Sequence, residues 1–147
     1  MQFSAESANS WIPASSMHLP ITALYAGLCG LIVFTLAFRV VVLRRRLRIG
    51  MGDGNNADLA RRVRIHANAV EHIPLLLILL ALAEGLGASP VLLHAAGIGV
   101  VIARVLHASG MTRSAGHSFG RFWGVLITWI VLALLSIWCV AMYFLRG

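Results

Sequence analysis

Residues 57–86 read ADLARRVRIHANAVEHIPLLLILLALAEGL. The second half of this stretch is apolar apart from Glu84, whereas the first half carries arginines and other hydrogen-bonding side chains. The apolar half alone is too short to cross a membrane, which takes about 20 residues at a rise of 1.5 Å each. A helix that begins at Ala57 is long enough, and Asn56 is placed to cap it by accepting from free backbone N–H groups. The stretch therefore predicts a membrane-spanning helix with a polar first half.

Three other long apolar runs flank this stretch. Within them the charged residues are few: Arg39 in the first run, Arg104 in the third and Arg121 at the start of the fourth. The sequence GASP at residues 87–90 predicts a tight turn between the second and third spans. The expected fold class is all-α, an integral membrane four-helix bundle. Its single domain covers residues 19–147, with spans at about 19–43, 57–86, 91–111 and 120–145. Gly97 and Gly99 in the third span predict close helix packing.

The first 17 residues are polar and weakly patterned. They carry no basic segment of the kind that opens a secretory signal peptide, so we expect none here. Residues 1–18 are expected to form a loose N-terminal segment. Because Met17 directly precedes the first apolar run, Met1 and Met17 are both candidates for the native start.

The composition of the 147-residue chain is that of a membrane protein. It is 59% hydrophobic and 12% charged, whereas a soluble domain is about half apolar and about a quarter charged. All twelve basic residues are arginine, and five acidic residues leave a net charge of +7. Such a charge in a soluble chain would suggest nucleic acid, but this chain is too apolar for that partner. The arginines instead set membrane orientation, contact anionic headgroups or hold an anionic ligand.

The arginines gather on one side of the expected membrane. Seven lie between the first two spans or at the start of the second, and two more follow the third span: Arg44, Arg45, Arg46, Arg48, Arg61, Arg62, Arg64, Arg113 and Arg121. On the other side the only basic residue is Arg146. Because basic loops stay in the cytosol, both termini are expected to face away from it.

The second span carries a polar stripe. Arg61, Arg64, Asn68 and Glu71 are separated by three or four residues and so share one helix face, with His72 at its edge. Arg64 and Glu71 are expected to be too far apart for direct pairing, and Asn68 between them is expected to hydrogen-bond either one. Ionisable groups inside a span are costly and are functional candidates by default. A purely structural polar clasp between helices is the alternative.

The third span repeats the pattern, because Arg104, His107 and Met111 share a face. Arg104 is expected at the depth of Glu71, and an ion pair between them would neutralise both. Glu84, near the outer end of its span, is expected to reach the interface. The chain has six histidines, but no pair combines helical spacing with a cysteine or a second carboxylate, so no metal site is expected.

Residues 61–74, RRVRIHANAVEHIP, resemble the second-helix signature of the MAPEG family, the membrane-associated proteins in eicosanoid and glutathione metabolism. The core of that motif is an arginine, then an asparagine after three intervening residues, then a glutamate after two more. Arg64, Asn68 and Glu71 match it. Residues 104–107, RVLH, are similar to the family's third-helix motif. The GDGN turn at 52–55 is similar to the corresponding turn in the family's bacterial branch. The resemblance covers roughly residues 19–145.

The resemblance implies a trimer of four-helix protomers that binds glutathione between adjacent subunits, near the cytosolic face of a bacterial inner membrane with periplasmic termini. Carried over by position, Arg64, Asn68 and Glu71 would contact glutathione, and Arg104 and His107 would support it. Arg121 is the best match to an arginine near the thiol and is the catalytic candidate. Arg44, Arg45 and Arg46 are further candidates, among which the sequence does not choose.

The chemistry of glutathione agrees with these residue types. Arginine binds carboxylates with two parallel hydrogen bonds, and Glu71 suits the ammonium group. A cation near sulfur favours the thiolate. The leading hypothesis is a glutathione-dependent membrane transferase or peroxidase that acts on hydrophobic electrophiles, with the bilayer, glutathione and a hydrophobic small molecule as partners.

Two alternatives remain open at this point. Family synthases use tyrosines near the sulfur, whereas this chain has only Tyr25 and Tyr143, and Met111 stands where some members have tyrosine. These departures favour a non-enzymatic lipid- or glutathione-binding scaffold on the same fold. A small multidrug-type transporter also has four spans, but it places an essential carboxylate in the first helix, which has none here.

Overall fold

The computed structural model describes residues 18–113 and 118–146. The expected loose segment at residues 1–18, apart from its last residue His18, and the alternative start at Met17 therefore lie outside the described residues.

Four helices make up the described chain, and this confirms the predicted all-α class. They are α1 (Pro20–Leu47), α2 (Ala57–Gly85), α3 (Pro90–Arg113) and α4 (Phe119–Arg146). All four are long and apolar enough to cross a membrane. The 28 residues of α1 rise about 42 Å, more than the hydrocarbon core of about 30 Å. The helices therefore extend past the hydrocarbon on at least one side.

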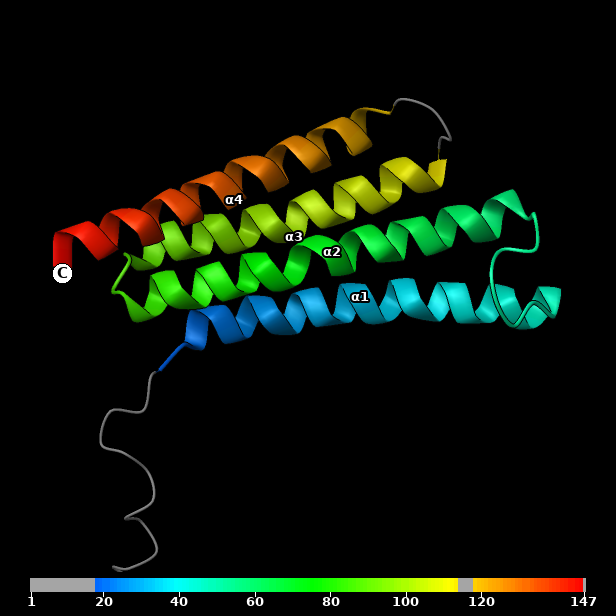
Figure 1. The fold of residues 1–147 in the computed structure, drawn as a ribbon, viewed down its shortest axis with the longest axis horizontal. Coiled ribbons are helices and arrows are strands. Elements are labelled where there is room, and N and C mark those ends of the chain that lie inside the picture. Colours follow the sequence, from blue (N-terminus) through cyan, green and yellow to red (C-terminus); the bar gives the residue numbers. More distant parts are fainter. Residues whose placement is uncertain (1–17, 114–117, 147) are drawn as a thin grey trace, which may run out of the picture.

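The helices lie side by side as a bundle, with α2 and α3 in the middle and α1 and α4 outside (Figure 1). In the part of the chain that the structure describes, α1 and α4 make no contact with each other. The last turns of α1 and α3 and the first turns of α2 and α4 meet at one end of the bundle. We call this the basic end, because the arginine-rich segments lie there, and we call the other the opposite end.

Local signals fix where the helices begin and end. The Asn56 side chain accepts a hydrogen bond from the backbone N–H of Leu59 at 2.9 Å, which confirms the predicted cap of α2. Past the end of α2, Gly87 has a φ of 76°. The N–H of Ala88 then bonds back to Ala83 O at 2.9 Å, a common glycine-terminated helix end. This turn brings α3 back alongside α2.

At the opposite end, polar side chains have partners within the protein. Glu84 of α2 accepts from the backbone N–H groups of Ile21 at 3.0 Å and Thr22 at 2.7 Å, in the first turn of α1. A carboxylate there satisfies free donors and complements the helix dipole. The Tyr25 hydroxyl lies 2.9 Å from Nδ1 of His94. The sequence indicated only that Glu84 lies near the interface, and the structure adds that it joins α2 to α1.

Small residues allow the helices to approach closely, as predicted for α3. A Cβ on Gly97 would collide with the ring of Tyr25, and one on Gly99 would lie 3.1 Å from Val131. α3 and α4 also approach closely at Gly124, where a Cβ would lie 2.7 Å from both Ala103 O and the Cβ of His107. At this point α4 lies directly against the part of α3 that carries Ala103 and His107.

Candidate functional site

A cavity of about 230 Å³ lies between α2, α3 and α4, in the half of the bundle toward the basic end. Three arginines, two histidines and two other polar residues line it together with three apolar side chains. The lining residues are Arg64, Asn68, His72, Arg104, His107, Met111, Arg121, Val125, Thr128 and Trp129. Five of the six predicted site residues are among them. The sixth, Glu71, lies beside the cavity.

Arg104 is the central side chain of this site and is only 3% exposed. Its guanidinium donates to Asn68 Oδ1 at 2.9 Å, to Gly124 O at 3.4 Å and to the hydroxyl of Thr128. Thr128 in turn donates to Gly124 O at 2.6 Å. Every one of these partners is neutral, and Nε has no partner at all within the described residues. Arg104 is thus held by all three helices without a counter-charge.

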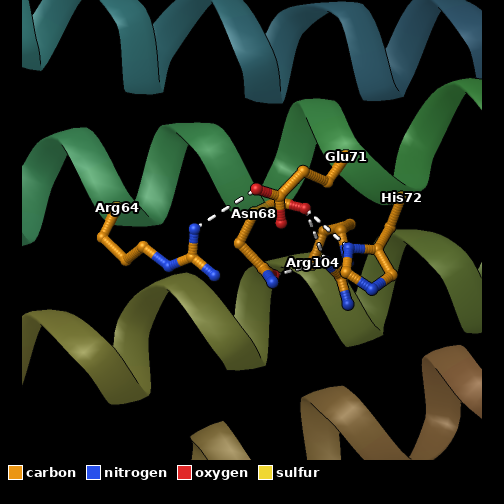
Figure 2. Close-up of polar contacts among 5 residues, drawn as sticks. All are labelled: Arg64, Asn68, Glu71, His72 and Arg104. Carbon is orange, nitrogen blue, oxygen red and sulfur yellow. Dashed lines mark hydrogen bonds and ion pairs between the residues drawn. The ribbon is translucent and has the colours of Figure 1, made fainter.

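Asn68 and His72 are oriented by this arrangement (Figure 2). Because Asn68 Oδ1 accepts from Arg104, its amide nitrogen is left to donate elsewhere. Nδ1 of His72 lies 2.9 Å from the backbone carbonyl of Asn68. A carbonyl only accepts, so Nδ1 is the donor, and with the proton on Nδ1 alone Nε2 would be an acceptor. The two side chains offer one donor and one acceptor for a ligand.

Arg64 and Glu71 form a direct ion pair, so the prediction that they are too far apart was wrong. Arg64 Nη1 lies 3.2 Å from Glu71 Oε1. The two residues are separated by seven positions, about 10.5 Å along the axis and nearly in line. The Glu71 side chain leans toward the helix start, as side chains in helices do, and the long arginine extends to meet it (Figure 2). The relative exposures of the two side chains are 63% and 49%.

The predicted ion pair between Arg104 and Glu71 was also wrong. Arg104 bonds instead to Asn68, one turn before Glu71, and Glu71 turns along its own helix to Arg64. The reason is the orientation of α2 about its own axis. It places Asn68, which is half-buried, toward α3, whereas it leaves Glu71 exposed. The expected bonds from Asn68 to Arg64 or Glu71 are likewise replaced by its bond to Arg104.

His107, Met111 and Arg121 complete one side of the cavity. His107 is 5% exposed and packs against Gly124. Arg121 is exposed in the first turn of α4, where its backbone N–H donates to the Ser118 hydroxyl at 3.3 Å. The structure therefore brings a buried cation, Arg104, and two exposed cations around one small space.

Thr128 and Trp129 were missed by the sequence analysis. Thr128 lies in a long apolar run and is 1% exposed. It lies seven residues after Arg121, on the same helix face. That spacing was the available signal, but it carries information only when the face of α4 that meets α3 is known.

The three arginines at the end of α1 do not line this cavity within the described chain. Arg44 donates to Gly52 O at 2.7 Å and so holds the turn after α1. Arg44, Arg45 and Arg48 line a separate open depression near Ile49. A role for Arg44, Arg45 or Arg46 in the site would therefore require a second copy of the chain.

These features define a class of protein, a four-helix membrane protein with a cationic site enclosed by three helices. The model of the MAPEG family matches residues 22–141, and the chain belongs to this family. The chain is 36% identical over 117 residues to inner membrane protein YecN of Escherichia coli strain K12, which covers 78% of this chain and 86% of that protein. The YecN protein of E. coli O6:H1, strain CFT073, gives the same values. At the family level, membership assigns the chain to membrane-associated, glutathione-related function.

Proposed function

We propose that the chain is a glutathione-dependent membrane transferase or peroxidase whose site is the Arg104 cavity. The observation that carries this proposal is Arg104 itself, a buried cation that bonds only to neutral groups. Burial of an unpaired charge is costly. In the described chain no acidic residue lines the cavity, and Glu71 is engaged by Arg64. An anionic ligand would supply the missing negative charge.

Glutathione fits this arrangement because it carries two carboxylates, an ammonium group and a thiol. The pair between Arg64 and Glu71 is half-exposed, and such pairs contribute less than about 1 kcal/mol. A ligand carboxylate can therefore replace Glu71 on Arg64, while the ligand ammonium takes the released Glu71. Asn68 donates its amide to a further carboxylate oxygen, and Arg104 acts by holding Asn68 and by its charge.

Arg121 is the proposed catalytic residue. Its cation at the cavity mouth favours the thiolate of bound glutathione, and Nε2 of His72 is an acceptor for the thiol proton. In conjugation, the sulfur forms a bond to an electrophilic carbon and the leaving group departs with its electron pair. In peroxide reduction, the sulfur takes the terminal oxygen, an alcohol is released, and a second glutathione reduces the sulfenic acid to give the disulfide and water.

The size of the cavity supports a site shared between chains. About 230 Å³ is below the 300–1,000 Å³ of ordinary ligand pockets. We propose that an adjacent protomer of a homotrimer completes the site, with Arg44, Arg45 or Arg46 as its contribution. We place this trimer in a bacterial inner membrane. The basic end and the site would face the cytosol, and the termini would lie in the periplasm.

Glutathione binding measured by calorimetry on purified protein tests the proposal. We expect binding at millimolar ligand or below, weakened at least tenfold in Arg64→Ala and in Glu71→Ala, because each removes a hydrogen bond to a charged group. Arg62→Ala is the matched control, since Arg62 pairs with Asp58 outside the cavity, and its affinity should match that of the unaltered protein. No binding at millimolar glutathione would overturn the proposal.

A non-enzymatic glutathione- or lipid-binding scaffold is the second candidate. The observation in its favour is that the cavity lining contains no tyrosine, and its one hydroxyl, Thr128, is already bonded. Turnover of chlorodinitrobenzene with glutathione separates the two candidates. Turnover that falls at least tenfold in Arg121→Ala supports the enzyme, whereas glutathione binding without turnover supports the scaffold.

A further inference from the structure

A second depression, of about 480 Å³, lies between α1 and α3. Its walls are mainly aliphatic, including Leu28, Leu31, Val101 and Val105, and Arg39 lies among its lining residues. The cavity described above is formed by α2, α3 and α4, so this groove is a different space. We call it the α1–α3 groove.

Arg39 is the unusual member of this groove. It lies eight residues before the end of α1, about 12 Å along the axis, and is half-buried. Across residues 18–113 and 118–146, its guanidinium has neither an ion pair nor a hydrogen bond to another side chain or to the backbone. A cation at this depth in a span calls for a partner.

The two helices that form the groove cannot supply a counter-charge. Neither α1 nor α3 contains an aspartate or a glutamate. The two hydroxyls in the groove are uncharged and donate to carbonyls of their own helices, Thr35 to Leu31 O at 2.8 Å and Ser109 to Leu106 O at 3.0 Å. Arg62 of α2 donates to the backbone carbonyl of Arg39 at 3.2 Å, and the carboxylate of Asp58 beside it is already paired with Arg62 at 3.0 Å.

We propose that the α1–α3 groove binds an anionic phospholipid of the bilayer. The phosphate accepts hydrogen bonds from Arg39, and one acyl chain lies along the aliphatic wall toward Leu28. Charge complementarity selects this occupant, because the groove joins one unpaired cation to a long apolar surface. Arginine binds phosphate with two parallel hydrogen bonds, and it reaches the headgroup level by extending along its own aliphatic stem.

Native mass spectrometry of the detergent-solubilised full chain tests this proposal. The probes are phosphatidylglycerol and phosphatidylethanolamine with identical acyl chains. We expect the protein to retain phosphatidylglycerol about tenfold more tightly, and we expect Arg39→Gln to abolish that preference. Arg48→Gln is the matched control, because it removes one charge from the exposed end of the same helix segment, and its preference should be unchanged.

A second variant tests the apolar part of the groove. Val105 is 52% exposed, so Val105→Trp fills the groove from the lipid side and leaves Arg39 in place. We expect it to release phosphatidylglycerol as Arg39→Gln does, with unchanged helix content by circular dichroism. Equal preference in Arg39→Gln and the unaltered protein, or equal loss in Arg48→Gln, would overturn the proposal. Disulfide cross-linking of Val105→Cys to a second chain would also overturn it, because the groove would then hold protein.

Discussion

The two ends of the bundle differ in how they accommodate a charged side chain. At the opposite end, the half-exposed carboxylate of Glu84 accepts two backbone hydrogen bonds from the first turn of α1, where the helix dipole supplies partial positive charge. Toward the basic end, Arg104 is more deeply buried, yet its partners are an amide, a hydroxyl and a carbonyl, none of them charged. One charged group is thus met by a helix dipole within the fold, whereas the other has no counter-charge among the described residues. We therefore propose a structural role for Glu84 and a ligand-binding role for the Arg104 site.

The largest expected effect is on ligand binding at the Arg104 site. Arg104→Met should weaken glutathione binding about 100-fold, because the cation and its hold on Asn68 are both lost. The ligand-free protein should change in stability by less than about 1 kcal/mol, since relief of an unpaired buried charge offsets the lost hydrogen bonds. Calorimetry and chemical unfolding measure the two effects. Unchanged affinity would remove the proposed distinction between the two ends.

Helix packing beside Arg104 gives the next largest effect. Gly124→Ala places a Cβ 2.7 Å from Ala103 O and from the Cβ of His107, and overpacking of this kind destabilises by about 1–3 kcal/mol. Gly30→Ala is the matched control, because a Cβ there meets nothing within 4 Å, and alanine favours a helix by up to about 1 kcal/mol. Thermal unfolding of both variants should give shifts of opposite sign. An unchanged unfolding midpoint in Gly124→Ala would mean that α3 and α4 are less closely packed.

The cap made by Glu84 should have a smaller effect on stability. Glu84→Gln replaces one accepting oxygen by a donor that faces the N–H groups of Ile21 and Thr22. We expect a loss of about 1–2 kcal/mol in the free energy of unfolding, with glutathione affinity unchanged. Asp53→Asn is the control, since the Asp53 side chain accepts only from the backbone N–H of Asn55, in an exposed turn of the described chain. Loss of glutathione binding in Glu84→Gln would contradict its structural assignment.

The smallest effect is expected for the ion pair between Arg64 and Glu71. Both side chains are substantially exposed, so a double-mutant cycle with Arg64→Ala and Glu71→Ala should give a coupling below about 1 kcal/mol in ligand-free stability. The same two changes should still weaken glutathione binding. A large coupling in stability would indicate a structural clasp, which is the alternative that the sequence left open.

The sequence predicts the four helices and groups most of the polar residues that line the cavity, for separate physical reasons. Long apolar runs and the arginines between them determine the spans, and residues spaced by three or four share a helix face whatever the tertiary packing. Partner choice is different, because it depends on the rotation of each helix about its axis. Asn68 turns toward α3 and Glu71 does not, so the predicted pair between Arg104 and Glu71 did not form. Thr128 and the bond from Glu84 to α1 were missed for the same reason.

The most direct test of the account compares glutathione with its dialkyl ester, which lacks both carboxylate charges, as stabilisers of the unaltered protein. The account predicts that glutathione raises the thermal unfolding midpoint as its concentration increases, by an amount equivalent to about 2.7 kcal/mol at 100 times the dissociation constant. It predicts no increase with the ester. An equal increase with both compounds, or none with glutathione, would contradict the claim that the arginine-lined cavity is an anion site.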